Sequence, residues 1–458
     1  MGLYKGIILR LKVTAVLLSI AVTSFAQRDS ILFEENHVID TTAIGELRIN
    51  VDNLNFFKNN EYESEIVKGY TLPGFWVKPS VSYQPLKNLK VDVGAYMIHY
   101  WGATKYPNFN YSDMPEWHGD QYQKGFHVLP FFRVQIDPTK RLSLILGTLY
   151  GHNNHNLIAP LYNYEMGLSG DPETGFQVIW DAPRLKLDSW INWESFIYRN
   201  DTHQESFSFG TSIRLLANSS DVPLHVYFPV QMIFQHRGGE INTEAEERQV
   251  KTWMNAAAGV GLTFNTRNTI VPWINLEACG VSYKQVAGDM LPFDKGHGFL
   301  GTASMRLWKF DISGEYWWCK DFISILGNPL YGAMGIEDKS YLLDKPSMIN
   351  AHLGYSQYLG KGFAWGIHGD VFNNIKENAV SWALGVYMRI NFNFLLKKFY
   401  ARSFFTTSEM AFPSALPASC LLARPITLPI SLMLVAPVWA IISFTAASIS
   451  SADNALGR

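Results

Sequence analysis

Hydrophobic and polar residues alternate along most of this chain. Between Leu47 and Phe394 the alternation forms about sixteen runs of roughly ten residues each. Successive side chains of a β-strand point to opposite faces, so each run predicts a strand with one apolar and one polar face. The last run shows this most clearly. Its apolar positions are Trp382, Leu384, Val386, Met388, Ile390, Phe392 and Phe394, and its alternate positions are Ser381, Ala383, Gly385, Tyr387, Arg389, Asn391 and Asn393.

The connections between these runs alternate between short and long. The short ones carry residues that tight turns favour. Outer-membrane barrels have short periplasmic turns and long external loops, and placing both barrel ends on the short rim requires an even strand number. We therefore predict an all-β fold, a transmembrane antiparallel up-and-down β-barrel of about 16 strands, within a range of about 14 to 18. The short connections are at 85–88, 137–140, 181–184, 218–221, 265–268, near Trp308 and at 360–362, and the long ones at 102–124, 151–172, 237–250, 285–296 and 319–346.

A soluble β-sandwich would also show alternation, with its apolar face turned toward a core. A soluble chain with this many strands would usually divide into domains of about 100 to 200 residues. No linker is visible between Leu47 and Phe394. Aromatic residues make up 14% of the chain, and many lie at the ends of runs, where the interface girdles of membrane barrels occur. Both observations favour the membrane barrel.

The amino terminus has the pattern of an export signal. Lys5, Arg10 and Lys12 precede an apolar stretch at 13–22, and small residues at 24–26 predict cleavage before Gln27. Residues 1–26 are therefore predicted to be a signal peptide. Residues 27–46 are polar without clear periodicity, and we expect a periplasmic lead-in that either stays outside or folds into the barrel mouth.

The carboxyl end departs from the barrel pattern. Alternation stops after Phe394, so the predicted barrel covers 47–394 and an atypical hydrophobic tail covers 395–458. Residues 426–445 lack charges, and hydropathy alone predicts a transmembrane helix there. Pro429 and Pro437 interrupt that stretch, and such a helix would stop export at the inner membrane. We interpret the tail as an aberrant extension.

Residues 27–394 resemble the Gram-negative outer-membrane β-barrel proteins, the porin-like group in particular. The resemblance rests on the signal peptide, the turn asymmetry, the alternation and the terminal Asn391-Phe392-Asn393-Phe394. It implies an outer-membrane channel for passive or mildly selective passage of small polar solutes, assembled as a homotrimer. Its partners would be outer-membrane lipid, the barrel-assembly machinery that recognises a terminal aromatic residue, and small polar solutes or saccharides.

A barrel of about sixteen strands is wide enough for an aqueous channel, so charged inward positions are candidate pore-lining residues. Removing the three positive charges of the signal peptide and the net three of the tail from the chain's net charge of −2 leaves about −8. This predicts a mild cation preference, and the absence of a basic excess argues against nucleic-acid binding. The candidates are Lys90, Asp92, Arg133, Lys186, Asp188, Glu194, Glu277, Lys309, Asp311 and Glu315.

Aromatic residues also occupy predicted inward positions. A row of them could stack against sugar rings, which makes a saccharide or polysaccharide export or assembly barrel an alternative function. The competing interpretation is that they fill space or support loops. These candidates are Tyr96, Tyr100, Trp190, Tyr198 and Trp317.

A lipid hydrolase at the barrel rim is the other alternative. The cluster His152, Asn153, Asn154 and His155 in a long loop could hold a general base and its orienting group. No G-x-S-x-G element accompanies it. We therefore predict that the chain is not an enzyme and has no catalytic residues.

Cofactor and metal sites are also not indicated. Asp113, Glu116, His118 and Asp120 could gather calcium, but their spacing follows no EF-hand pattern. The three cysteines, an odd number, suggest neither a disulfide framework nor a zinc site. The longest loop, at 320–345, could fold inward to narrow the pore, cap the barrel or add a hairpin.

Overall fold

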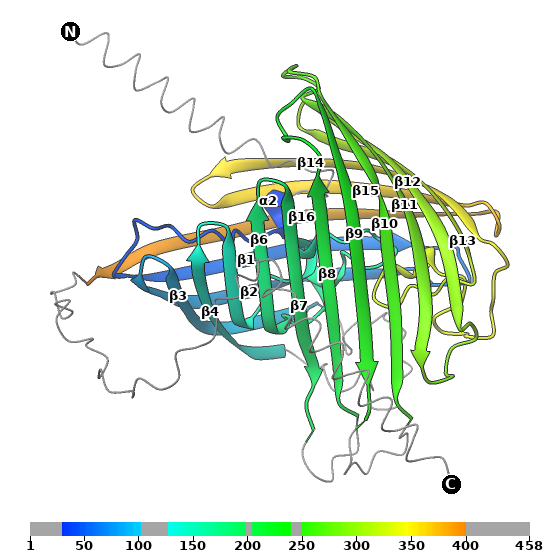
Figure 1. Ribbon diagram of the computed structural model, residues 1–458, viewed down its shortest axis with the longest axis horizontal. Helices are drawn as coiled ribbons and strands as arrows, with labels where there is room; N and C mark the ends of the chain where they lie inside the picture. The colour runs from blue at the N-terminus through cyan, green and yellow to red at the C-terminus, as the bar shows by residue number, and fades with distance from the viewer. Residues whose placement is uncertain (1–29, 102–126, 198–203, 240–248, 400–458) are drawn as a thin grey trace, which may run out of the picture. The chain divides into compact units, whose positions relative to one another are not determined.

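The computed structural model describes residues 30–101, 127–197, 204–239 and 249–399. Sixteen antiparallel strands form a closed barrel there, and β1 pairs with β16 (Figure 1). The predicted fold class and strand number are confirmed. The strands are β1 (Glu46–Glu61), β2 (Tyr70–Leu86), β3 (Leu89–Tyr100), β4 (His127–Thr139), β5 (Leu142–Thr148), β6 (Thr174–Ala182), β7 (Leu185–Ser195), β8 (Ser206–Leu216), β9 (Leu224–Arg237), β10 (Lys251–Asn265), β11 (Trp273–Ala287), β12 (Lys295–Leu307), β13 (Phe310–Lys320), β14 (Ser347–Gly360), β15 (Phe363–Asn374) and β16 (Ala379–Lys398).

All seven predicted tight turns connect consecutive strands. Two boundaries differ from the predictions. The connection expected at 285–296 is shorter, because β11 pairs with β10 as far as Ala287. The last strand continues past Phe394, because its ladder with β1 extends to the pair Glu46 and Lys398.

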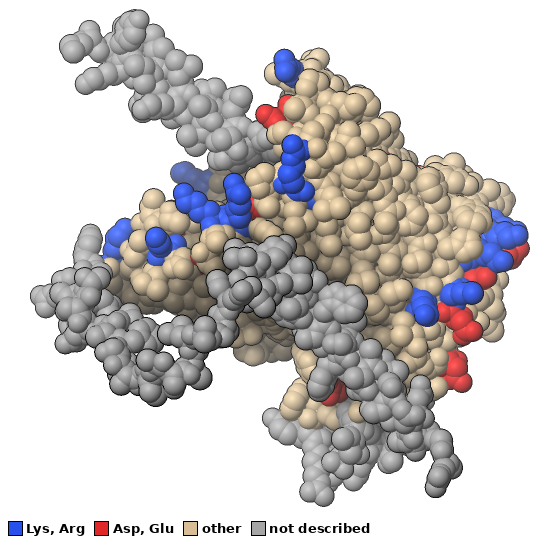
Figure 2. All heavy atoms as spheres, in the orientation of Figure 1, with Lys and Arg blue, Asp and Glu red and all other residues tan. Residues whose placement is uncertain are grey.

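The two faces of the last strand lie as the alternation predicted. In β16, Trp382, Leu384 and Met388 are exposed on the outside, whereas Tyr387 and Arg389 are buried toward the lumen. The visible outer wall is a broad surface of uncharged residues, with charged side chains gathered around its edges (Figure 2). Apolar residues outside and buried polar residues inside are the arrangement of a barrel that spans a membrane. A closed antiparallel barrel with one rim of short turns is the architecture of the Gram-negative outer membrane, where the short-turn rim faces the periplasm.

The lumen contains three segments of the chain. The first includes α2 (Ser30–Phe33), the second follows β5 and includes η2 (His152–His155) and α3 (Met166–Ser169), and the third follows β13 and includes η3 (Pro329–Tyr331). In Figure 1, β8–β10 cross in front of β14, β16 and β1. Apolar residues of the second and third segments form one hydrophobic core with residues of the wall.

The third segment lies in the loop that the sequence placed at 320–345. It folds inward and adds no strand to the barrel. Phe322, Ile323, Tyr331, Ala333 and Met334 are fully buried. The inward-folding alternative is therefore the observed one.

No helix in the described ranges is long and apolar enough to cross a membrane. The predicted signal peptide at 1–26, the calcium-binding alternative at 113–120 and the hydrophobic helix at 426–445 all lie outside the described residues.

Candidate active site

The barrel wall is short along the barrel axis where the second luminal segment begins, and we call this the low part of the wall. β5 has 7 residues and β6 has 9, whereas β4 has 13. β4 pairs with β3 from His127 onward but with β5 only from Arg133 onward. The long-loop end of β4 therefore has a strand neighbour on one side only. Residues 149–173 turn into the lumen directly behind this low part of the wall.

His155 lies in the lumen, where both of its ring nitrogens have carboxylate partners and one ring face packs against an indole. Nδ1 lies 2.7 Å from Asp188 Oδ2 and Nε2 lies 2.5 Å from Glu173 Oε2. The ring stacks on Trp190, with centroids 3.4 Å apart and planes 5° from parallel. Burial lowers the pKa of His155, but the Coulombic attraction of Glu173 and Asp188 outweighs this and raises it to about 9. His155 is thus a fixed imidazolium, and neither nitrogen is free to accept a proton.

Glu173 connects His155 to a second histidine. Burial raises the pKa of Glu173, but the neighbouring His155 outweighs burial and lowers it to about 2, so the carboxylate is ionised. Tyr162 donates a hydrogen bond of 2.7 Å to Glu173 Oε1. The same hydroxyl oxygen lies 3.0 Å from His152 Nδ1. Because the tyrosine proton points to the carboxylate, Nδ1 of His152 must donate to the tyrosine oxygen.

Glu173, Tyr162 and His152 thus form a hydrogen-bond relay, which leaves Nε2 of His152 as a hydrogen-bond acceptor. Burial in the lumen lowers the pKa of His152, so the ring is neutral at pH 7. With Nδ1 protonated, Nε2 carries the lone pair. His152 also has a φ of 54°, an uncommon value for a residue other than glycine. A neutral, oriented histidine of this kind can act as a general base.

A small cavity adjoins His152. Its volume is about 50 Å³, and its lining includes His152, Glu173, Thr148, Phe131 and Trp76. Polar and aromatic groups therefore meet behind the low part of the wall. Thr148 adds a hydroxyl to this cavity, and that hydroxyl accepts a hydrogen bond of 3.3 Å from Phe132 N.

The amino-terminal segment is bound beside this loop. Asn154 forms two hydrogen bonds with the backbone of Glu35, 2.7 Å and 3.0 Å long. The Glu35 carboxylate pairs with Lys78 and with Arg133. Burial raises the pKa of Glu35, but these two cations outweigh it and hold the pKa well below its usual value. Arg389 binds Asp52 through Nε and Nη2, and its Nη1 donates to the carbonyl oxygens of residues 32 and 34.

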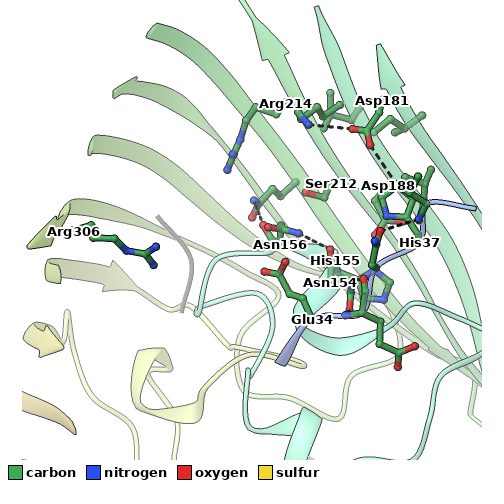
Figure 3. Close-up of a pocket in the computed structure, with 18 residues that line it drawn as sticks. Glu34, His37, Asn154, His155, Asn156, Asp181, Asp188, Ser212, Arg214 and Arg306 are labelled. Carbon is green, nitrogen blue, oxygen red and sulfur yellow. Dashed lines mark hydrogen bonds and ion pairs between the residues drawn. The ribbon is translucent and has the colours of Figure 1, made fainter. Parts of the chain in front are cut away.

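Two larger polar cavities flank residues 34–36. One has a volume of about 470 Å³ and the other of about 760 Å³. Figure 3 shows the first, with His155 and Asp188 at one side and Arg306 across from them. Both include residues near the short turns, such as Arg306 and Gly362, so they occupy the periplasmic part of the lumen.

Nine of the ten charged residues predicted to line a pore lie on strands, and Lys309 lies in the turn between β12 and β13, with its ammonium over the Trp308 ring. The others have partners. These pairs are Lys90 with Asp92, Arg133 with Glu35, Lys186 with Asp181, Asp188 with His155, Glu194 with Ser206, Glu277 with Tyr227, Asp311 with Arg306, and Glu315 with Tyr331.

Four of the five aromatic candidates are buried. Trp190 is covered by His155, Trp317 packs against Phe322 and Tyr331, and Tyr100 donates to the Leu168 carbonyl. Tyr96 belongs to the core that surrounds Leu32 of the amino-terminal segment. Tyr198 lies outside the described residues.

The sequence analysis selected His152 and His155 but missed Tyr162, Glu173 and Glu35. No spacing motif links these residues, because their contacts arise only when separate segments meet in the lumen.

The fold and the site define an outer-membrane barrel whose lumen holds a histidine relay. A family model matches residues 39–399, described as lipid A 3'-O-deacylase-type. The chain belongs to this family. Among proteins with curated functions, none matches the sequence.

Several solved outer-membrane proteins are similar in structure. OccAB4 of Acinetobacter baumannii has a TM-score of 0.41 at 9% identity, covering 78% of this chain and 100% of that one. OprD of Pseudomonas aeruginosa has a TM-score of 0.40 at 10% identity, covering 76% and 94%. OpdK of the same organism has a TM-score of 0.43 at 10% identity, covering 77% and 100%. Similarity at this level carries no information on function.

The family membership corrects one prediction. We expected no enzymatic activity because the sequence has no G-x-S-x-G element, but the family is named for an enzyme. That element marks one class of serine hydrolase, and its absence leaves other hydrolytic arrangements open.

Proposed function

We propose that this barrel hydrolyses an acyl ester of lipid A in the outer membrane, with His152 as the general base. The relay from Glu173 through Tyr162 to His152 is the observation that carries the proposal, because it orients a neutral imidazole. The match to the lipid A 3'-O-deacylase-type family supports this substrate class.

The chemistry follows from the hydrogen bonds. Nε2 of His152 would take a proton from a water molecule as its oxygen attacks the ester carbonyl. The ester bond then breaks, giving a free fatty acid and the sugar hydroxyl, to which His152 returns the proton. Glu173 stays ionised beside His155, so it stabilises the imidazolium that forms on His152 through Tyr162.

The low part of the wall supports access from the membrane. Long-loop rims of outer-membrane barrels face outward, so the short strands β5 and β6 lower the wall on the side of the outer leaflet. An acyl chain could approach His152 over this edge without crossing the whole barrel.

The test uses the full chain in vesicles that contain lipid A, with released fatty acids measured by mass spectrometry. We expect His152→Gln to lower the rate by about 10²- to 10⁴-fold. His297→Gln is the matched control, because His297 is exposed on β12 and contacts Trp318. Equal rates for the wild type and His152→Gln would contradict the role of His152, and a wild type without fatty-acid release would contradict the proposed reaction.

Passage of small polar solutes is the second candidate. The two polar cavities on either side of residues 34–36 favour it, since movement of this short segment would join them. The mild cation preference, the homotrimer and the interaction with the assembly machinery remain proposals that belong to this function.

A further inference from the structure

A buried lysine lies at the long-loop rim, on a different strand from the residues that hold the histidine relay. Lys251 is the first residue of β10 and pairs directly with Arg237, the last residue of β9. Lys251 is 0% exposed and Arg237 is 2% exposed. Both side chains point to the inside, because Arg237 continues the buried face of β9 that includes Gln231 and Gln235. Two cationic side chains thus share one position on the inner wall.

The ammonium of Lys251 has no partner. Its Nζ is buried and makes no hydrogen bond within the described part of the chain. Glu194 is an acidic side chain on the same inner face, and its carboxylate accepts hydrogen bonds from Ser206 and Gln235. A buried ammonium without an acceptor is strongly unfavourable, so lysines are almost never fully buried unless they are paired.

We propose that Lys251 and Arg237 form a binding site for a phosphate monoester group at the outer rim of the barrel. A phosphate supplies several acceptor oxygens for a compact ammonium and for the planar fork of a guanidinium. The site lies where the long loops leave the barrel, on the side that faces phosphorylated lipid headgroups and external solutes. This site goes beyond the proposed hydrolysis, and it stands whether or not the barrel cleaves an ester.

The lysine environment is compact. A side chain added at Gly288 would lie 3.4 Å from Lys251 Cγ and 3.0 Å from the Val250 carbonyl oxygen. Gly288 has a φ of 83°, which glycine adopts without strain. Backbone therefore covers the lysine stem closely, and the ammonium is the part that a ligand would satisfy.

The experiment measures thermal unfolding and binding of the full chain in phosphate-free detergent. Inorganic phosphate is one probe. Bilayer discs with phosphatidic acid, compared with discs of phosphatidylcholine, are the other. We expect at least one of these phosphates to bind and to raise the unfolding temperature of the wild type, and Lys251→Met to weaken that binding by about tenfold or more. Lys284→Met is the matched control, because Lys284 is an exposed lysine on the neighbouring strand β11.

The second measurement compares the thermal stability of the wild type and Lys251→Met in the absence of phosphate. Lys251→Met should be at least as stable as the wild type without phosphate, because methionine removes an unpaired buried charge. Binding of inorganic phosphate would identify a site for free phosphate, and response to phosphatidic acid alone would identify a headgroup site. A wild type that responds to neither, an unchanged response in Lys251→Met, or a less stable Lys251→Met without phosphate would each overturn the proposal.

Discussion

The imidazole of His155 lies flat against the indole of Trp190, with ring centroids 3.4 Å apart. His155 carries a positive charge at neutral pH because Glu173 and Asp188 bind its two nitrogens. A cation over an indole face is stabilised electrostatically, and more strongly when water is excluded. This contact joins the second luminal segment to the wall strand β7, so it positions the relay that ends at His152.

Loss of the His155 charge should loosen the luminal loop. The pKa of His155 is raised to about 9 from 6.5, so its contribution to stability is complete below about pH 6.5 and disappears as the pH rises through about 9. We expect the unfolding temperature in detergent to fall over this range. His155→Gln should be less stable by about 3 to 5 kcal/mol, because it leaves the buried Glu173 and the partly buried Asp188 without their cation. It should also lose this pH dependence. His297→Gln serves as control, and an unchanged alkaline transition in His155→Gln would refute the assignment.

The pH dependence of the hydrolysis rate should follow the protonation state of His152. Burial lowers the pKa of His152 below 6.5, and a general base acts only when it is neutral. The rate of fatty-acid release should therefore be constant around pH 7 and fall on acidification, with a midpoint below 6.5. Tyr162→Phe removes the group that orients Nδ1, so it should lower kcat by at least about tenfold with little change in KM. An acidic midpoint at or above 6.5, or full kcat in Tyr162→Phe, would contradict the relay.

The sequence predicted the barrel wall well because strand alternation is a local property. The exposed Met388 and the buried Arg389 follow directly from a period of two residues. Turn residues such as those at 181–184 marked the strand ends for the same reason. The contents of the lumen could not be predicted in this way. Tyr162 and Glu173 meet His152 through a loop without periodicity.

The amino-terminal segment illustrates the same limit. The sequence left open whether residues 27–46 stay outside or enter the barrel mouth. Leu32 is fully buried in the lumen, and its backbone carbonyl binds Arg389, which is 357 residues away in the chain. Such a contact depends on barrel closure, which places β16 beside β1.

A face-specific substitution on β16 should test the orientation of the wall. Met388→Arg puts a charge on the outward apolar face, where arginine near the bilayer midplane costs about 2 to 4 kcal/mol. Asn391→Arg is the matched control, since Asn391 lies on the opposite face of the same strand and lines the larger cavity. Urea unfolding in lipid vesicles should show a large loss for Met388→Arg and a small change for Asn391→Arg. Equal losses would show that these two faces do not differ in environment.

Release of the amino-terminal segment should open a path for ions if solute passage is a function of this barrel. Arg389 holds the segment through the carbonyl oxygens of Leu32 and Glu34, and Leu32 occupies a hydrophobic core. In Arg389→Met combined with Leu32→Ser, Asn154, Lys78 and Arg133 still bind Glu35, so we expect residues 31–34 to loosen. This movement should connect the two polar cavities. We expect the full-length wild type to show low single-channel conductance in planar bilayers and the double variant to show steady, larger steps. Arg48→Met, at the rim where Arg48 binds Glu46, should behave as the wild type. If the double variant still folds as a heat-modifiable barrel and its conductance stays at the wild-type level, this segment does not gate the lumen.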